Sequence, residues 1–238
     1  MIKFFKKIRQ RLLTENKFSK YIFYAIGEII LVVVGILIAL QVNTWNEWRK
    51  DRKQEKEILI DLKLNLENNI TIFRARIDYF NFGQKSGKII MDVIDNKLPN
   101  HDSLGIYFFK ATGGYGGADV ISFVGYEAFR NNGFSLVANK SLKDEILKLF
   151  ENTYSHLISI DGTFVQHNSY QREILGQLFY QNEDDSLMPY DYDMILKSQT
   201  YYSSLTDFYH NYGWMKEETN KGLSETRRVL KLINEELE

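Results

Sequence analysis

The sequence predicts an all-α protein: a single N-terminal transmembrane helix that continues into a long helix, followed by an extracytoplasmic helical bundle. Three observations carry this prediction. An apolar run occupies residues 21–42, apolar residues recur at steps of three and four through much of the remainder, and only 2 prolines occur in 238 residues, so little forces the helices to stop. The chain has no cysteine, which excludes disulfides and thiol chemistry but leaves the compartment open.

The apolar run at residues 21–42 is long enough to cross a bilayer. At about 1.5 Å per residue it spans roughly 33 Å, against about 30 Å for a hydrocarbon core. A cleavable signal peptide is the competing interpretation, but its apolar region is only about 7 to 15 residues long and ends at a small-x-small site, and neither feature fits here. We therefore expect a single-pass anchor in contact with membrane lipid, with Tyr21 at one interface and Trp45 and Trp48 at the other.

The charges that flank this run set the expected orientation. Residues 1–20 carry many Lys and Arg side chains and the single acid Glu15, whereas bases and acids are interleaved after Trp48. Because positive flanks stay inside, residues 1–20 are expected to be a basic cytoplasmic segment, and residues 44–238 a helical domain outside the cytoplasmic (inner) membrane, in the periplasm if the cell is Gram-negative. The basic segment either lies on anionic headgroups as a short helix or is a disordered tail.

Glu28 is the unusual residue of the span. On a helical wheel of 100° per residue, Glu28, Gly35 and Ala39 fall within about 20° of one line. Gly35 and Ala39 allow a second helix to approach closely, and a polar group in hydrocarbon is stabilised when it finds a partner there. This face indicates helix packing, with a second copy or with another membrane protein. Alternatively, Glu28 is protonated or reaches toward the headgroups, and the small residues reflect ordinary transmembrane composition.

The N-terminal segments "FFKKIRQRLLTENKFSKY" and "AIGEIILVVVGILIALQVNTWNEWRK" resemble a family of uncharacterised single-pass membrane proteins of Gram-negative bacteria, classed only as a domain of unknown function. The likeness is specific over residues 1–50 and looser through "GYEAFRNNGFSLVANKSLKDEI". It implies the same topology and adds no activity. It also implies a shared pattern without a stated role, formed by Glu28, Gly35, Asn43, Trp45 and Asn46.

Four main helices, packed as a bundle, are predicted within residues 44–238. The first follows apolar positions from Leu59 to Ile94 and ends before Pro99. A second begins near residue 141. Two later segments complete the set, at residues 164–180 and, with the near-heptad spacing of a coiled coil, at residues 215–237.

Shorter signals mark the ends of elements in the middle of the chain. Residues 119–133 predict a short helix with Ser122 as its N-cap and Gly133 as a left-handed stop. Ser141 is expected to cap the helix that follows. The tyrosine-rich stretch at residues 190–214 predicts a helix whose aromatic face packs on the bundle, with a partner or ligand surface as the alternative.

No linear motif reveals chemistry. "ATGGYGGADV" lacks the Lys of a phosphate loop, "GFSLV" lacks the second glycine of a nucleophile elbow, and the acidic "NEDDSLMPYDYD" lacks EF-hand spacing and is expected to be a solvated loop. The four histidines show no metal-binding pair, and His167, on an apolar helix face, is expected to be hydrogen-bonded in or near the core. We predict no catalytic, cofactor-binding or metal-ligating residues and, because basic and aromatic residues do not cluster in the exterior domain, no nucleic-acid partner.

Two functions remain open. The first is a non-enzymatic, membrane-anchored helical interaction or sensing module that acts through partner proteins or self-association. The second is a membrane-anchored hydrolase whose site is assembled from dispersed carboxylates and tyrosines. The first is favoured because the standard catalytic signatures are absent from the sequence. A cleft that gathers several carboxylates or histidines would favour the second.

Overall fold

The computed structural model describes residues 18–112, 120–184 and 186–238. The chain divides into two compact units, Met1–Gln54 and Glu55–Glu238, and helix α2 (Phe18–Asp95) contributes residues to both. The described part is almost entirely helical, with a long N-terminal apolar helix followed by a helical C-terminal region, which confirms the predicted fold class. Most of the predicted basic segment and the glycine-rich motif at residues 113–117 lie outside the described residues.

The second unit is built from the end of α2 and a series of shorter and longer elements. Two of them are π-helices, denoted η, and two are short strands. In chain order they are α3 (Leu104–Ala111), α4 (Val124–Ala128), η1 (Phe129–Gly133), α5 (Lys140–Leu147), η2 (Lys148–Tyr154), α6 (Ser155–Leu175), β1 (Phe179–Gln181), β2 (Leu187–Pro189), α7 (Tyr192–Ile195) and α8 (Gln199–Leu237).

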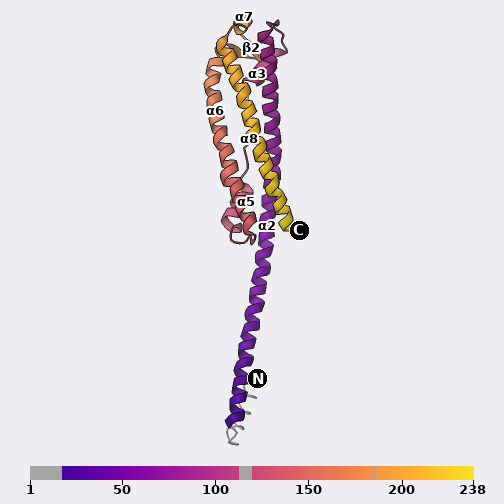
Figure 1. The fold of residues 1–238 in the computed structure, drawn as a ribbon, viewed down its shortest axis with the longest axis vertical. Helices are drawn as coiled ribbons and strands as arrows, with labels where there is room; N and C mark the ends of the chain where they lie inside the picture. Colours follow the sequence, from indigo (N-terminus) through magenta and orange to yellow (C-terminus); the bar gives the residue numbers. More distant parts are fainter. Residues whose placement is uncertain (1–17, 113–119, 185) are drawn as a thin grey trace. The chain divides into compact units, whose positions relative to one another are not determined.

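Three long helices, α2, α6 and α8, lie side by side in this unit (Figure 1). The rings of Phe80 and Phe164 join α2 to α6 with centroids 6.1 Å apart, and both rings also contact Tyr212 of α8. A methyl group added at Gly83 would lie 2.6 Å from the Tyr212 ring, so glycine at that position allows α8 to approach α2 closely. The predicted apolar face of α2 is confirmed, since its core residues are buried: Leu59, Leu62, Leu66, Ile70, Phe73, Phe80, Ile90, Val93 and Ile94.

The predicted helix start at Ser122 is wrong. Helix α4 starts two residues later, at Val124, and no side chain caps it. Ser122 instead contacts two asparagines of α2: its backbone N–H donates to Asn69 Oδ1 at 2.8 Å, and its hydroxyl accepts from Asn65 Nδ2 at 2.8 Å. Its hydroxyl therefore joins the segment before α4 to α2 rather than capping a helix.

Gly133 is not the predicted left-handed stop either. Element η1 ends at Gly133 as expected, but the φ of Gly133 does not lie in the left-handed region, and the C-cap residue Phe134 has a right-handed φ of −58°. A Cβ at Gly133 would lie 2.7 Å from Cγ2 of Ile58. Glycine is therefore needed here for close contact with α2 rather than for an unusual backbone conformation.

The helix expected to begin at Ser141 is capped by Asn139, whose Oδ1 accepts from the Leu142 N–H at 3.1 Å. This helix does not end before a separate segment at residues 164–180. Elements α5, η2 and α6 follow one another without a gap from Lys140 to Leu175, with π-helical hydrogen bonding in the middle. The predicted two helices are thus one, and it stops five residues earlier than expected.

The acidic stretch expected to be a solvated loop contains regular structure. Strands β1 and β2 form an antiparallel hairpin in which Phe179 pairs with Pro189 and Gln181 with Leu187. Phe179 faces the core, with its ring centroid 5.2 Å from that of Phe108 and 5.1 Å from that of Tyr201. The expected aromatic face of the following helix is confirmed, since α8 buries Tyr201, Phe208 and Tyr212.

Candidate functional site

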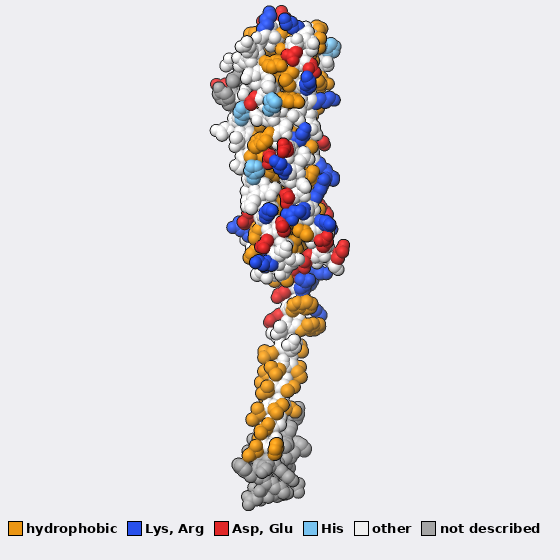
Figure 2. Space-filling model, viewed as in Figure 1, with side chains coloured by type: hydrophobic (Ala, Val, Ile, Leu, Met, Phe, Trp, Pro, Cys, Tyr) orange, Lys and Arg blue, Asp and Glu red, His pale blue; other side chains and the backbone are white. Residues whose placement is uncertain are grey.

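The apolar part of α2 is the most exposed hydrophobic surface of the described chain. Every residue from Ile29 to Lys50 is exposed, and the side chains are predominantly apolar through Val42 (Figure 2). The helix is long and apolar enough to cross a membrane by length and composition. A soluble helix of this composition would have to bury one face against its own protein, and this one does not.

The predicted helix-packing face lies in this segment. Nothing lies within 4 Å of a Cβ placed on Gly35, Ala39 is exposed, and Glu28 is partly buried. The open space beside Gly35 would admit a neighbouring helix, and whether one packs there stays a prediction.

The predicted interfacial anchors are located only in part. Trp45 and Trp48 are exposed, and the guanidinium of Arg49 lies 5.9 Å from the ring centroid of Trp45, within cation–π range. Asn43 Nδ2 donates to Glu47 Oε1 at 2.9 Å one turn along the helix. The side chain of Tyr21 lies outside the described residues.

Within the second unit, four polar pairs along one edge join the α5–α6 helix, or its cap Asn139, to α8, in addition to the buried pairs Tyr154–Thr226 and Gln171–Ser204. The first member of each edge pair lies within residues 139–167 and the second within residues 207–236. As the first residue number rises, the second falls by nearly the same amount, as expected for two antiparallel helices. From one end to the other the pairs are Asn139 with Glu236, Glu145 with Arg228, His156 with Glu218, and His167 with Asp207.

The two histidine pairs have matching spacings. Eleven residues separate His156 from His167, and eleven separate Asp207 from Glu218, which is about three helical turns on each helix. Each histidine therefore meets a carboxylate from the same edge of α8. His167 was expected in or near the core, but its side chain is 36% exposed and its Nε2 donates to Asp207 Oδ2 at the edge.

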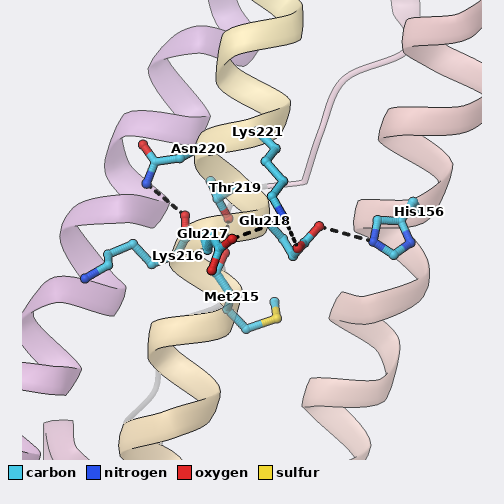
Figure 3. A network of polar contacts seen from close by, with 8 residues as sticks. All are labelled: His156, Met215, Lys216, Glu217, Glu218, Thr219, Asn220 and Lys221. Carbon is cyan, nitrogen blue, oxygen red and sulfur yellow. Dashed lines mark hydrogen bonds and ion pairs between the residues drawn. The ribbon is translucent and has the colours of Figure 1, made fainter.

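The pair formed by His156 belongs to a larger charged cluster (Figure 3). His156 Nε2 lies 3.4 Å from Glu218 Oε2, while Lys221 Nζ lies 2.7 Å from Glu218 Oε1 and 3.3 Å from Glu217 Oε1. The hydrogen bond from Lys221 and, less strongly, that from His156 hold the pKa of Glu218 below its usual value. The Glu218 carboxylate therefore contacts the ammonium group of Lys221 with one oxygen and the imidazole of His156 with the other.

Helices α2 and α6 are joined by a salt bridge of a different kind. Arg76 is 2% exposed and donates from both terminal nitrogens to Asp161, with the Nη1–Oδ2 distance at 2.7 Å. Its Nε is buried without a hydrogen-bond partner. The pair fixes one position of α2 against one position of α6, because a buried guanidinium cannot shift away from its carboxylate without losing both hydrogen bonds.

The interior also holds hydroxyl and amide groups. Tyr154 and Thr226 are joined by a 2.8 Å hydrogen bond, and Ser204 donates to Gln171 Oε1 at 2.7 Å. Burial raises the pKa of Tyr154 to about 12, although its hydrogen bonding with Thr226 and Asn69 opposes the shift. Among the described residues, three further buried groups have no hydrogen-bond partner: the Tyr201 hydroxyl, Asn65 Oδ1 and Asn168 Oδ1.

An open cleft of about 380 Å³ lies beside the hairpin. Neither histidine nor a carboxylate lines it; the lining residues are Gln177, Leu178, Met194, Lys197, Ser198 and Thr200. Among the described residues, no three His, Cys, Asp or Glu side chains come together as metal ligands would.

Sequence reasoning missed the partners in all of these contacts. Arg76, Asp161 and Asp207 gave no signal on their own, since charged residues on helices are usually solvated. One signal was present, however. The equal spacing of His156 from His167 and of Asp207 from Glu218 places each pair of side chains on one face of its helix.

The chain is thus a helical protein, and its described residues include one apolar helix long enough to cross a membrane. Residues 28–99 match a family described as a family of unknown function, DUF6090. No curated protein and no solved structure matches the chain. The expected likeness to an uncharacterised domain is confirmed over this range, which includes Glu28, Gly35 and Ala39, and the family's description assigns no activity to it.

Proposed function

We propose that this protein is a membrane-anchored helical module that acts through partner proteins or self-association rather than by catalysis. One observation carries the proposal. The second unit buries its own apolar residues in a continuous core, whereas the apolar segment of α2 leaves every residue from Ile29 to Lys50 exposed. A surface this apolar requires a lipid environment or another helix around it.

The proposed topology is a single pass through a cytoplasmic (inner) membrane. Residues 1–20 lie in the cytoplasm, residues 21–42 span the membrane, and residues 44–238 form a periplasmic helical domain. The excess of Lys and Arg before the span supports this orientation, and Trp45 with its neighbouring Arg49 suits the headgroup region at the outer end. A periplasm-dependent reporter fused to the C-terminus is expected to be active, and an inactive fusion would reverse the orientation.

The packing face of the span is proposed to bind a second copy of the same helix. Gly35 has open space around it and Ala39 lies about one turn further along the same line, so two such helices can approach closely. A second Glu28 would then lie near the first, where a shared proton or a hydrogen bond stabilises a polar group that hydrocarbon disfavours.

The test uses the fact that the chain has no native cysteine. Ala39→Cys puts a thiol on the proposed face, and Leu37→Cys puts one on the opposite side of the helix, where Leu37 is also exposed. Oxidation in native membranes is expected to give disulfide dimers for Ala39→Cys and few for Leu37→Cys. Adding Gly35→Leu to Ala39→Cys should remove the dimers, because the larger side chain separates the helices.

Equal dimer yields from the two cysteine positions, or a yield insensitive to Gly35→Leu, would exclude self-association through this face. Mass spectrometry of the proteins crosslinked to Ala39→Cys then distinguishes another membrane protein from lipid alone. The alternative of an anchored hydrolase draws no support from the cleft beside the hairpin, because its lining offers no histidine or carboxylate as an acid or base.

A further inference from the structure

We infer that the edge between α6 and α8 is a proton-responsive contact. When His156 and His167 are protonated, they hold α6 more tightly to the N-terminal half of α8. The inference concerns the second unit only and names a stimulus for the sensing role proposed above. Its test does not depend on how the membrane segment associates.

The position of the histidines along the edge is the first observation. Near the C-terminal end of α8, Arg228 forms an ion pair with Glu145 of α5. Arg228 also contacts Glu225 at 2.8 Å. Toward the other end of α8, the two ion pairs between the described parts of the helices use histidine instead. Of the side chains in these pairs, only imidazole ordinarily changes its charge between pH 5 and pH 8. The two halves of one edge should therefore respond differently to pH.

The two histidine pairs differ in strength. Nε2 of His167 is hydrogen-bonded to Asp207, and the ring also lies edge-on to Phe208 with centroids 6.3 Å apart. His156 lies at ion-pair distance from a carboxylate that Lys221 already contacts. Each contact already has an ionised acceptor, and protonation of the imidazole turns it into a contact between opposite charges, which adds Coulombic attraction. His167 and Asp207 are therefore the main responsive pair.

The surrounding charged and titratable groups do not replace this response. Asp161 lies on α6 between the two histidines in sequence, but it is paired with Arg76 of α2. The positive charge of Arg172 acts on Tyr79 of α2. On α8, Lys221 contacts both Glu218 and Glu217, Lys216 donates to Gln84 of α2, and the ring of His210 lies against Tyr209.

The packing beneath the edge explains why small changes in the pairs can open this part of the interface. Near its start, the α5–α6 helix buries large apolar side chains at Phe150 and Tyr154. Further along α6, the buried positions include Asn168 and Gln171, and Asn168 Oδ1 has no hydrogen-bond partner. A segment with less apolar burial and an unpaired polar group has a lower free energy of local opening. The histidine pairs lie beside that segment.

The test is hydrogen exchange with mass spectrometry on the full-length chain in detergent micelles, at pH values between 5.5 and 8, with rates corrected for intrinsic exchange. Protection of amides at residues 160–172 and 203–212 is expected to fall about two- to fivefold per pair as the pH rises, which is the range for half-exposed ion pairs. Amides at residues 142–150 and 226–233, next to Arg228, are the internal control and should change little.

Substitutions assign the response to the named residues. His167→Gln keeps a hydrogen-bond donor without a titratable charge and should remove most of the pH dependence, and His156→Gln added to it should remove the rest. His210→Gln is the matched control. His210 is exposed on α8, the helix that carries the partners Asp207 and Glu218, and its substitution should leave the response unchanged. A pH dependence that is equal in both halves of the edge, or that survives in the double variant, would overturn the inference.

A second measurement reports the separation of the helices directly. Because the chain lacks cysteine, spin labels can be placed at Gln166→Cys on α6 and Ser203→Cys on α8, which are both exposed positions. The distance distribution is expected to broaden toward longer values at pH 8 compared with pH 5.5. An unchanged distribution together with unchanged exchange would show that the edge does not respond to protons.

Discussion

Arg76 of α2 and Asp161 of α6 form a salt bridge with two hydrogen bonds, and the guanidinium is almost completely buried while the carboxylate is 29% exposed. This difference in burial between the two side chains determines how the salt bridge affects the stability of the fold. The arginine has already lost its hydration, so the carboxylate is required to balance a charge that cannot reach water. The pair specifies how α2 packs on α6 more than it adds net stability.

Asp161→Asn is therefore expected to lower the free energy of unfolding by about 2–3 kcal/mol. Removing one partner of a fully buried pair costs about 3–5 kcal/mol, and the partial exposure of Asp161 reduces that cost. The double change Arg76→Met with Asp161→Leu should recover most of the loss, since apolar side chains of similar volume replace buried pairs well. Urea unfolding followed by circular dichroism measures both.

The matched control for this prediction is the exposed pair Lys88–Asp92 on α2, whose side chains are 64% and 52% exposed. Asp92→Asn should change the free energy of unfolding by no more than about 0.5 kcal/mol, because solvent screens exposed pairs. If Asp161→Asn cost as little as Asp92→Asn, the buried pair would not stabilise the contact between α2 and α6.

Glycine has opposite roles at two helical positions. A Cβ at Gly125 of α4 would lie 2.8 Å from Asn65 Cβ and 2.9 Å from the backbone oxygen of Asp61, whereas nothing lies within 4 Å of a Cβ at Gly162 of α6. Gly125→Ala should therefore destabilise by about 1–3 kcal/mol, since the backbones must separate. Gly162→Ala should stabilise by about 0.5–1 kcal/mol through helix propensity alone. Thermal melts of the two variants should shift in opposite directions, and shifts of the same sign would contradict the contact between α4 and α2.

The sequence predicts some features of this fold and misses others for identifiable reasons. The apolar face of α2 from Leu59 to Ile94 was predictable because helical periodicity is a local property. Ser122 was misassigned as a cap because its actual partners, Asn65 and Asn69, lie more than fifty residues away. The hairpin was missed because strands of three residues form only where a core residue such as Phe179 holds them.

The candidate site shows the same division. The apolar run and its line of small residues could be read directly from spacing, since both belong to one helix. The salt bridge of Arg76 with Asp161 and the pairs of His156 and His167 join separate helices, so their existence depends on packing that one sequence does not encode locally. Equal spacings on two helices were a usable hint, but only once the helices were known to run antiparallel in contact.

The two candidate caps of α5 can be separated by experiment. Asn139 accepts the Leu142 N–H and donates to Glu236 at 2.8 Å, whereas Ser141 is an exposed residue inside the helix. Asn139→Ala is expected to cost about 1 kcal/mol, because a helix N–H loses its acceptor. Ser141→Ala should be neutral or slightly stabilising, because alanine favours helix interiors. Chemical denaturation distinguishes the two, and a larger loss for Ser141→Ala would reassign the cap.

Alkaline solution is expected to destabilise the helical unit through Tyr154. Its pKa is raised from 10.0 to about 12 by burial, so the folded state favours the neutral phenol more than the unfolded state does. A raised pKa contributes stability that is fully present below pH 10 and is lost as the pH rises toward 12, at about 1.4 kcal/mol per pH unit for one group. Unfolding measured at pH 9 and pH 11.5 should therefore show a steep decline in stability.

Tyr154→Phe assigns that decline to one residue. Thr226 Oγ1 already donates to the Gly222 carbonyl at 2.7 Å, so Tyr154 is the donor in its bond with Thr226, and the phenol is also hydrogen-bonded to the buried Asn69. The variant should lose about 1 kcal/mol at pH 7 but show a shallower decline above pH 10 than the wild type. Tyr180→Phe, at an exposed position on β1, is the matched control and should keep the wild-type slope. Identical slopes for Tyr154→Phe and the wild type would assign the alkaline loss to other groups, lysines included.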